Sequence, residues 1–327
     1  MHQLERHQAW ICLLAALAGF GLGVAWPGAT DLPEAWLWLL LAALLYCNFV
    51  DVRFRQIGAG LADRRFMAAA LLGNFALLPL LVWWLSGRVG DDPAVRLGVV
   101  LVLLLPCTDW FMAFASMAGG DARRAVALAP VNLVLQLLLL PLYLNWILPA
   151  GVVSGLATGG VVVAFGLLVG VPLALAAATR VWIRRSRADG VRRLPAACAR
   201  LAVPLLAAVV LLVAATQAGV VMASPAVLAT VGWVFAVFLL AAALLARLLM
   251  GWFQLPPAAG RVLAFSFGTR NSFVALPLAL ALPEAFAVTA VIIVFQSLVE
   301  LLGMVALLWL VPRRWFRDHA RVPVAMR

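Results

Sequence analysis

Long apolar stretches alternate with short polar segments along almost the whole chain. About 20 apolar residues are enough to cross the hydrocarbon core of a bilayer as a helix, and the pattern repeats ten times. It therefore predicts an all-α polytopic membrane protein with ten transmembrane helices. These run approximately over Trp10–Trp26, Ala35–Val50, Met67–Leu85, Leu97–Met117, Ala125–Leu148, Val152–Ala178, Leu201–Met222, Val227–Met250, Val262–Leu282 and Phe286–Val311.

The composition agrees with a lipid environment. Of the 327 residues, 66% are hydrophobic and 11% are charged, whereas about a quarter of an average soluble protein is charged. The net charge of +11 does not indicate a nucleic-acid partner, because all 24 basic residues are Arg and lie in short gaps between apolar stretches.

The distribution of the arginines predicts the orientation. With the amino terminus inside the cell, 21 of the 24 arginines fall on the cytoplasmic side, and only Arg88 and Arg96 fall outside. Cytoplasmic loops carry such an excess, so we expect a multi-pass protein of the cell (inner or plasma) membrane with both termini cytoplasmic. The Arg-rich loop Thr179–Arg200 is interpreted as a topology determinant beside anionic lipid; the alternative is a regulatory or partner-binding role.

Five predicted helices in each half suggest a duplication into residues 1–150 and 151–327. An odd number per half makes the copies face opposite ways, which gives an inverted repeat. Pro106-Cys107-Thr108-Asp109-Trp110 interrupts helix four, and Gly268-Thr269-Arg270-Asn271-Ser272 interrupts helix nine in the equivalent place, 162 residues later. Paired interruptions by Pro or Gly with polar groups point to the binding site of a transporter.

Three ionisable acid or base side chains are expected well inside the helices: Asp109, Arg270 and Glu300. An unpaired charge there costs several kcal/mol, so we expect Arg270 to pair with Glu300 or Asp109. Either the pair is a static link between helices, or the remaining acid carries a proton during transport.

Cys107 follows a helix-breaking proline and precedes Thr108. A thiol in this position suits a thiophilic solute such as trivalent arsenic or antimony; the alternative is a packing cysteine beside a kink. The other cysteines lack polar motifs and are interpreted as small apolar side chains: Cys12, Cys47 and Cys198.

Several polar side chains within the helices either line the same cavity or form hydrogen bonds between helices. The set comprises Asn132, Gln136, Asn271, Ser272 and Gln296. For Asn48 and Asn74, bonding between helices is the favoured interpretation.

An intramembrane enzyme does not fit this inventory. The histidines lie only near the termini (His2, His7 and His319), so no Ser–His pair or zinc site is expected in the membrane. An aspartyl enzyme needs two intramembrane aspartates, and only Asp109 qualifies. We therefore expect no enzyme, no catalytic residue and no cofactor. A channel is compatible with the sequence, although the paired interruptions favour alternating access.

The whole chain resembles the bile acid/sodium symporter superfamily, and most closely its arsenical-resistance (arsenite efflux) permeases. Pro106-Cys107-Thr108 is similar to the Pro-Cys-Thr motif of those permeases, and Leu298-Val299-Glu300 to their Leu-Val-Glu segment. The resemblance implies two inverted five-helix repeats whose broken helices four and nine cross at the binding site. It also carries the functional cysteine of the permeases onto Cys107 and their essential glutamate onto Glu300.

Helix nine resembles the symporter branch instead. Gly268-Thr269-Arg270-Asn271-Ser272 is similar to its Gly-Met-Gln-Asn-Ser pattern. However, Ser266 replaces the sodium-binding Glu of that branch, and Arg270 replaces the Gln that contacts sodium. A guanidinium in that position would repel sodium and substitute for its charge, so we expect one or both sodium sites to be lost.

These observations predict a secondary active transporter that exports arsenite or antimonite, coupled to protons and not to sodium. The expected substrate site comprises Cys107, as the metalloid contact, with Thr108, Asn271, Ser272 and Gln296. Ion or proton coupling is assigned to Asp109, Arg270 and Glu300. The alternative is an organic anion transporter with Arg270 as carboxylate partner. The expected partners are thus a small-molecule or metalloid substrate, protons and the lipid bilayer.

Overall fold

The computed structural model describes residues 3–26, 28, 34–51, 63–108, 110–148, 159–186, 188–216, 218–223 and 225–316. Over these ranges the chain is helical and has no strand beyond one isolated bridge. Five segments are long and apolar enough to cross a membrane, and shorter apolar helices accompany them. The five are Arg64–Ser86, Ala122–Ile147, Leu194–Thr216, Pro225–Trp252 and Glu284–Arg313. The chain is therefore a multi-pass membrane protein.

The helices of the first half match the first five apolar stretches. They are α1 (Gln3–Ala25), α2 (Glu34–Asp51), α4 (Arg64–Leu72), the π-helical turn η3 (Gly73–Leu77), α5 (Leu78–Ser86), α6 (Pro93–Leu104), α7 (Trp110–Met117) and α8 (Ala122–Ile147). The predicted break in helix four is confirmed, because α6 ends at Leu104 and α7 begins at Trp110.

The second half also gives helices at the later stretches. It comprises α10 (Gly159–Arg185), α11 (Asp189–Arg192), α12 (Leu194–Thr216), α13 (Ala218–Ala223), α14 (Pro225–Trp252), α15 (Pro257–Gly268), α16 (Ser272–Leu280), the 3₁₀ turn η4 (Glu284–Phe286), α17 (Ala287–Leu310) and the π-helical turn η5 (Val311–Trp315). However, α10 and α12 extend into the predicted loop Thr179–Arg200, and α12 ends before Met222. The predicted break in helix nine is confirmed as well, between α15 and α16.

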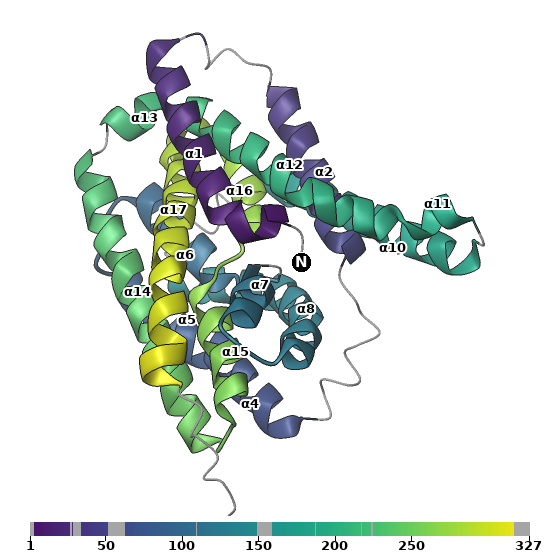
Figure 1. The fold of residues 1–327 in the computed structure, drawn as a ribbon. Coiled ribbons are helices and arrows are strands. Elements are labelled where there is room, and N and C mark those ends of the chain that lie inside the picture. Colours follow the sequence, from purple (N-terminus) through teal and green to yellow (C-terminus); the bar gives the residue numbers. More distant parts are fainter. Residues whose placement is uncertain are drawn as a thin grey trace, which may run out of the picture.

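The helices form two groups that pack mainly within themselves. In the first, which we call the outer layer, α12 packs against α1 and α2, and α10 packs against α2. In the second, the inner bundle, α14, α15 and α17 pack together with α4 to α8. Helix α16 touches α2 and α10 as well as α17, and α12 touches α17, so the second half of broken helix nine lies where the two groups meet. Figure 1 shows the end of α10, α11 and the beginning of α12 extending away from the remaining helices.

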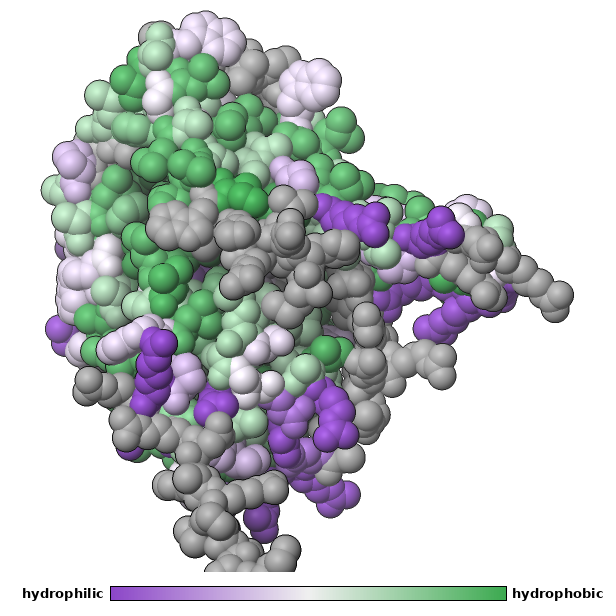
Figure 2. All heavy atoms as spheres, viewed as in Figure 1, coloured by the Kyte–Doolittle hydropathy of each residue, from purple (hydrophilic) through white to green (hydrophobic). Residues whose placement is uncertain are grey.

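Hydrophobic and hydrophilic side chains are segregated on the surface. In Figure 2 apolar residues cover most of the upper part, and strongly hydrophilic residues gather on the α10–α11 arm and at the lower end. Large apolar side chains are widely exposed, such as Leu138 at 68% and Leu248 at 70%. Such a surface would promote aggregation in water, whereas hydrocarbon solvates it.

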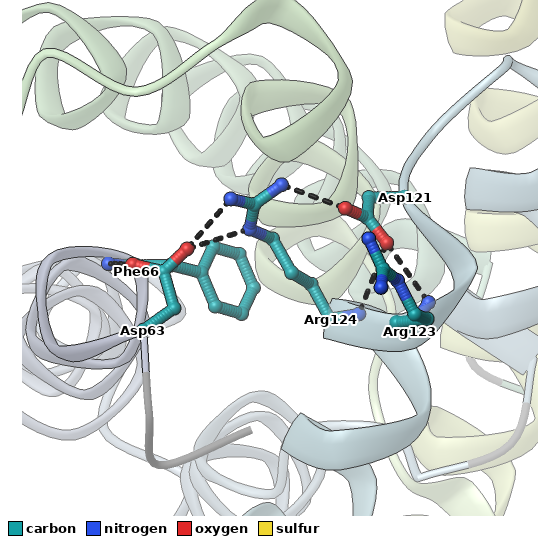
Figure 3. A network of polar contacts seen from close by, with 5 residues as sticks. All are labelled: Asp63, Phe66, Asp121, Arg123 and Arg124. Carbon is teal, nitrogen blue, oxygen red and sulfur yellow. Dashed lines mark hydrogen bonds and ion pairs between the residues drawn. The ribbon is translucent and has the colours of Figure 1, made fainter. Parts of the chain in front are cut away.

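One end of the inner bundle is held by Arg124 on α8 (Figure 3). Its Nε and Nη2 donate to Asp63 Oδ2 at 2.8 and 2.6 Å, and its Nη1 donates to Asp121 Oδ2 at 2.7 Å. Both acids are also N-caps, since Asp63 accepts from the Phe66 amide and Asp121 from the amides of Arg123 and Arg124. The guanidinium therefore ties the first turn of α4 to the first turn of α8.

This contact also sets the charge state of Asp63. Partial burial acts to raise its pKa, but the hydrogen bond from the Phe66 amide and the charge and hydrogen bonds of Arg124 outweigh that effect. The pKa of Asp63 consequently lies below its ordinary value of 3.8. Because the folded-state pKa of Asp63 is depressed, its contribution to stability is present at neutral pH. This contribution is lost as the pH falls through the folded-state pKa.

We expect Arg124→Gln to lower the free energy of unfolding by about 1 kcal/mol, since it removes two partly exposed ion pairs. The measurement is thermal unfolding of the purified protein in detergent at pH 7. Arg123→Gln is the matched control, because Arg123 contributes only its main-chain amide to Asp121. Equal effects of the two substitutions would contradict the assignment of the contact to Arg124.

Candidate functional site

The two helix breaks pair with each other through their main chains. The Cys107 amide donates to Thr269 O at 3.2 Å, and the Asn271 amide donates to Leu105 O at 2.7 Å. Together these bonds form an antiparallel bridge centred on Pro106 and Arg270. The breaks therefore lie side by side, and each satisfies polar groups that the other exposes.

Local sequence explains why both helices stop here. Pro106 lacks an amide hydrogen and disfavours a helical Leu105, whose φ of −98° and ψ of 103° are extended. Asn271 is the side-chain cap of α16, and the first amide of α7 bonds a cysteine sulfur. Cys107 Sγ accepts from the Trp110 amide at 3.3 Å, and Asn271 Oδ1 accepts from the Val274 amide at 3.3 Å.

On the α17 side of the bridge lies a chain of polar contacts. Glu300 Oε2 accepts from the Arg270 amide at 2.8 Å and from Gln296 Nε2 at 2.7 Å. Ser272 Oγ donates to Gln296 Oε1 at 3.3 Å, and Ser297 Oγ donates to Ser272 Oγ at 2.8 Å. Glu300, at 3% exposure, is thus attached directly to the backbone of the break.

The side chain of Arg270 extends to the opposite side of the bridge. Its Nη1 donates to Leu103 O at 3.1 Å, near the end of α6. Its Nη2 donates to Ser266 O at 3.3 Å and to Phe267 O, near the end of α15. The guanidinium carbon also lies 5.1 Å from the centre of the Phe238 ring. The cation therefore neutralises the unpaired carbonyls at the carboxyl ends of two half-helices, where the helix dipole is negative.

This geometry corrects the expectation of an ion pair between Arg270 and Glu300. Glu300 bonds the main-chain amide of Arg270, while the guanidinium bonds carbonyl oxygens on the other side. The carbonyl oxygens at the two helix ends lack intrahelical donors, and the guanidinium supplies them. Asp109, the other predicted partner, lies outside the described residues.

Asn74, for which the sequence favoured hydrogen bonding between helices, forms such bonds and also belongs to this site. Its Oδ1 accepts from Arg270 Nη2 at 3.4 Å, and its Nδ2 donates to Ser266 Oγ at 3.0 Å. It lies on the π-helical turn η3, a distortion often found at functional positions. A Cβ atom at Gly73 would lie 2.0 Å from the Phe267 ring, so only glycine permits this close approach. The available signal was the Gly73-Asn74 pair inside an apolar helix.

Asn132 also belongs to the guanidinium side. Its Nδ2 donates to Ser266 Oγ at 3.5 Å, and it is fully buried, like Gln136 one turn further along α8. The sequence left open whether these polar residues line one cavity or form hydrogen bonds between helices, and the Asn132–Ser266 and Ser272–Gln296 contacts are bonds between helices. Ser272 and Gln296 lie on the Glu300 side, and Asn132 lies on the guanidinium side.

A cavity adjoins the Glu300 side, between the outer layer and the inner bundle. Its polar lining comes from Arg270, Ser272, Ser297 and Glu300. Leu206, Val209 and Val210 of α12 form an apolar wall, together with residues of α16 and α17. Trp110 lines the cavity, whereas Cys107 and Thr108 are not among its lining residues and are buried at 2% and 4% exposure. Seven of the eight predicted site residues are therefore described, and six of them contribute to the bridge or its hydrogen bonds or line the cavity: Cys107, Arg270, Asn271, Ser272, Gln296 and Glu300.

The model of the Sodium Bile acid symporter family matches residues 38–248. The chain belongs to this family. The match covers α2 to most of α14, including the break in helix four and the α12 wall of the cavity. Since the family is one of transporters and not of enzymes, a polar site between two helix groups is consistent with solute binding.

The chain is similar to a curated relative, "Arsenical-resistance protein Acr3" of Corynebacterium glutamicum. The two are 28% identical over 124 residues, which is 38% of this chain. The matched part spans 32% of the relative's own length. The resemblance to both branches, drawn from Cys107, Arg270 and Glu300, is confirmed at the level of the family.

We expect Asn74→Ala to lower the free energy of unfolding by about 1–3 kcal/mol, because it removes an acceptor from the buried guanidinium and a donor from Ser266. Thermal unfolding in detergent measures the effect. Asn132→Ala is the control, since it removes one 3.5 Å contact to the same Ser266 and none to Arg270. A larger loss for Asn132→Ala would contradict the role given to Asn74.

Proposed function

We propose that this chain is a secondary active transporter that exports trivalent arsenic or antimony hydroxides, coupled to protons and not to sodium. The observation that carries the proposal is the position of Cys107. Its amide takes part in the bridge between the breaks, and its sulfur lies at the start of α7 beside the cavity-lining Trp110. A soft sulfur at the crossing suits a thiophilic solute, and the similarity to an arsenical-resistance protein supports the same substrate class.

The proposed architecture is ten membrane-spanning helices in two inverted repeats, residues 1–150 and 151–327. The two breaks and the 162-residue spacing of their motifs support it. The proposed location is the cell membrane with both termini cytoplasmic. The arginines assigned to the cytoplasm at Arg64 and Arg124 lie at one end of the inner bundle, whereas Arg96, assigned outside, bonds Ile147 O at the other.

The placement of Arg270 supports independence from sodium. Carbonyl oxygens at half-helix ends are the groups with which transporters of this kind hold a cation, and here a guanidinium already bonds three of them. A sodium ion entering that place would meet a fixed positive charge. Proton coupling is assigned to Glu300, a buried acid that lines the cavity and bonds the break directly.

Organic anion transport with Arg270 as carboxylate partner is the second candidate. The apolar wall formed by α12 and α17 favours it, because such a wall suits a carbon skeleton. The bonding of Arg270 favours the metalloid instead, since Nη1 and Nη2 already have oxygen partners. A neutral metalloid hydroxide needs no free guanidinium.

In a host that lacks its own arsenite efflux, we expect the wild-type chain to confer arsenite resistance and to lower arsenic accumulation. Cys107→Ser is expected to abolish both effects, because a hydroxyl is a poor ligand for a soft metalloid. Cys12→Ser, on α1, is the control and is expected to behave as the wild type. Transport of an organic anion that survives Cys107→Ser, without any arsenite phenotype, would favour the second candidate.

In proteoliposomes we expect arsenite transport to respond to a pH gradient and not to a sodium gradient. Arg270→Gln is expected to reduce sodium-free transport at least about tenfold, because the carbonyl oxygens of α6 and α15 lose their cation. Glu300→Gln, a nearly isosteric change, is expected to remove the response to the pH gradient. Transport by the wild type that depends on a sodium gradient would overturn this coupling.

A further inference from the structure

Two cysteines of the outer layer face each other across neighbouring helices. Cys47 lies in the last turns of α2, and Cys198 lies in the first turns of α12. Cys198 is a near neighbour of the Cys47 thiol, and both are free cysteines. Their exposures are 5% and 6%. The sequence had suggested two unrelated apolar side chains, whereas helix packing makes them a dithiol.

The surroundings hold the two helix ends in place. Arg180 of α10 donates through Nε and Nη2 to Val50 O at 3.1 and 2.7 Å, which satisfies a carbonyl at the end of α2. Tyr46, the neighbour of Cys47, bonds Thr179 through their hydroxyl groups at 3.0 Å. Helix α2 therefore packs against both α10 and α12 near the two cysteines.

The two thiols restrict the kind of ligand that this site can bind. Structural zinc sites use four protein ligands, but the described residues contain no group of three or more His, Cys, Asp or Glu side chains able to hold a metal ion. Two thiols without a third such ligand suit a trivalent metalloid hydroxide, which binds two sulfurs and keeps one hydroxyl. Soft thiolate ligands also prefer soft centres of this type.

We propose that Cys47 and Cys198 form a second binding site for trivalent arsenic or antimony, separate from the helix breaks. Arsenous acid, As(OH)3, condenses with both thiols. Two S–As bonds form and two As–O bonds break, and each thiol proton leaves with a hydroxide as water. The oxidation state of arsenic does not change, so the step requires no oxidant or reductant.

Helix α12 connects the two cysteines to the cavity. Leu206, Val209 and Val210, which form the cavity wall, follow Cys198 on the same helix by about two to three turns. Arsenic bound at the dithiol joins α2 to α12 and so fixes the helix that carries this wall. The meaning of the site for transport rests on the proposed function, but the binding chemistry does not.

Equilibrium dialysis of the purified full-length chain against arsenite tests the proposal. In a Cys107→Ser background we expect one bound arsenic per chain, the loss of two titratable thiols, and release by a dithiol such as dimercaptopropanol. Adding Cys47→Ser or Cys198→Ser is expected to weaken binding at least about tenfold, because a ligand atom is removed. Adding Cys12→Ser to the same background is the matched control and is expected to leave binding unchanged.

A second measurement needs no substitution at the dithiol. Arsenite is expected to protect Cys47 and Cys198 of the wild type from maleimide labelling after unfolding, as read by peptide mass spectrometry. Arsenic binding that is insensitive to both serine variants would overturn the proposal. So would thiols that disappear without bound arsenic and return with a monothiol, since that result indicates a disulfide. Because Cys107→Ser is predicted to lack transport, binding in that background separates this proposal from the proposed function.

Discussion

The pairing of the two helix breaks is the constraint on which the site depends. A broken helix in an apolar environment exposes amides and carbonyls whose loss of hydrogen bonds costs several kcal/mol each. Here the break at Pro106 and the break at Arg270 satisfy each other through two main-chain bonds. That solution requires α6 and α15 to approach each other end to end, and it places the first residues of α7 and α16 at the same cavity.

Arg270 connects the two sides of this bridge. Its amide bonds Glu300, which lines the cavity, while its guanidinium reaches Asn74 and the carbonyl ends of α6 and α15. One residue therefore anchors an acid on one side and supplies a positive charge on the other. A shift of the break would move both, so the protonation of Glu300 and the position of the half-helices are mechanically linked. This linkage is what the proposed proton coupling requires.

Among the described residues, the outer layer contributes an apolar wall to the cavity and no charged side chains. Helix α12 presents leucine and valine to the cavity, and the polar groups come from the inner bundle. An apolar interface between two helix groups permits sliding without breaking hydrogen bonds, which suits alternating access around a fixed site. The Cys47–Cys198 pair lies within this layer, at the opposite end of α12 from its contact with α13, and so is placed to affect the layer without touching the bridge.

The sequence alone determined the helical class, the apolar stretches, the positions of both breaks and their likeness to one family. These properties depend on local features: the length of an apolar run, a proline without an amide hydrogen, and a glycine beside polar residues. Motifs in the sequence also identified Cys107 and Glu300 as candidate site residues. Only the tertiary structure decided that Arg270 bonds carbonyls instead of a carboxylate, that Asn74 joins the site, and that Cys47 meets Cys198. Those contacts join residues far apart in the chain, and the rotation and register of packed helices, which set them, leave no local pattern in the sequence.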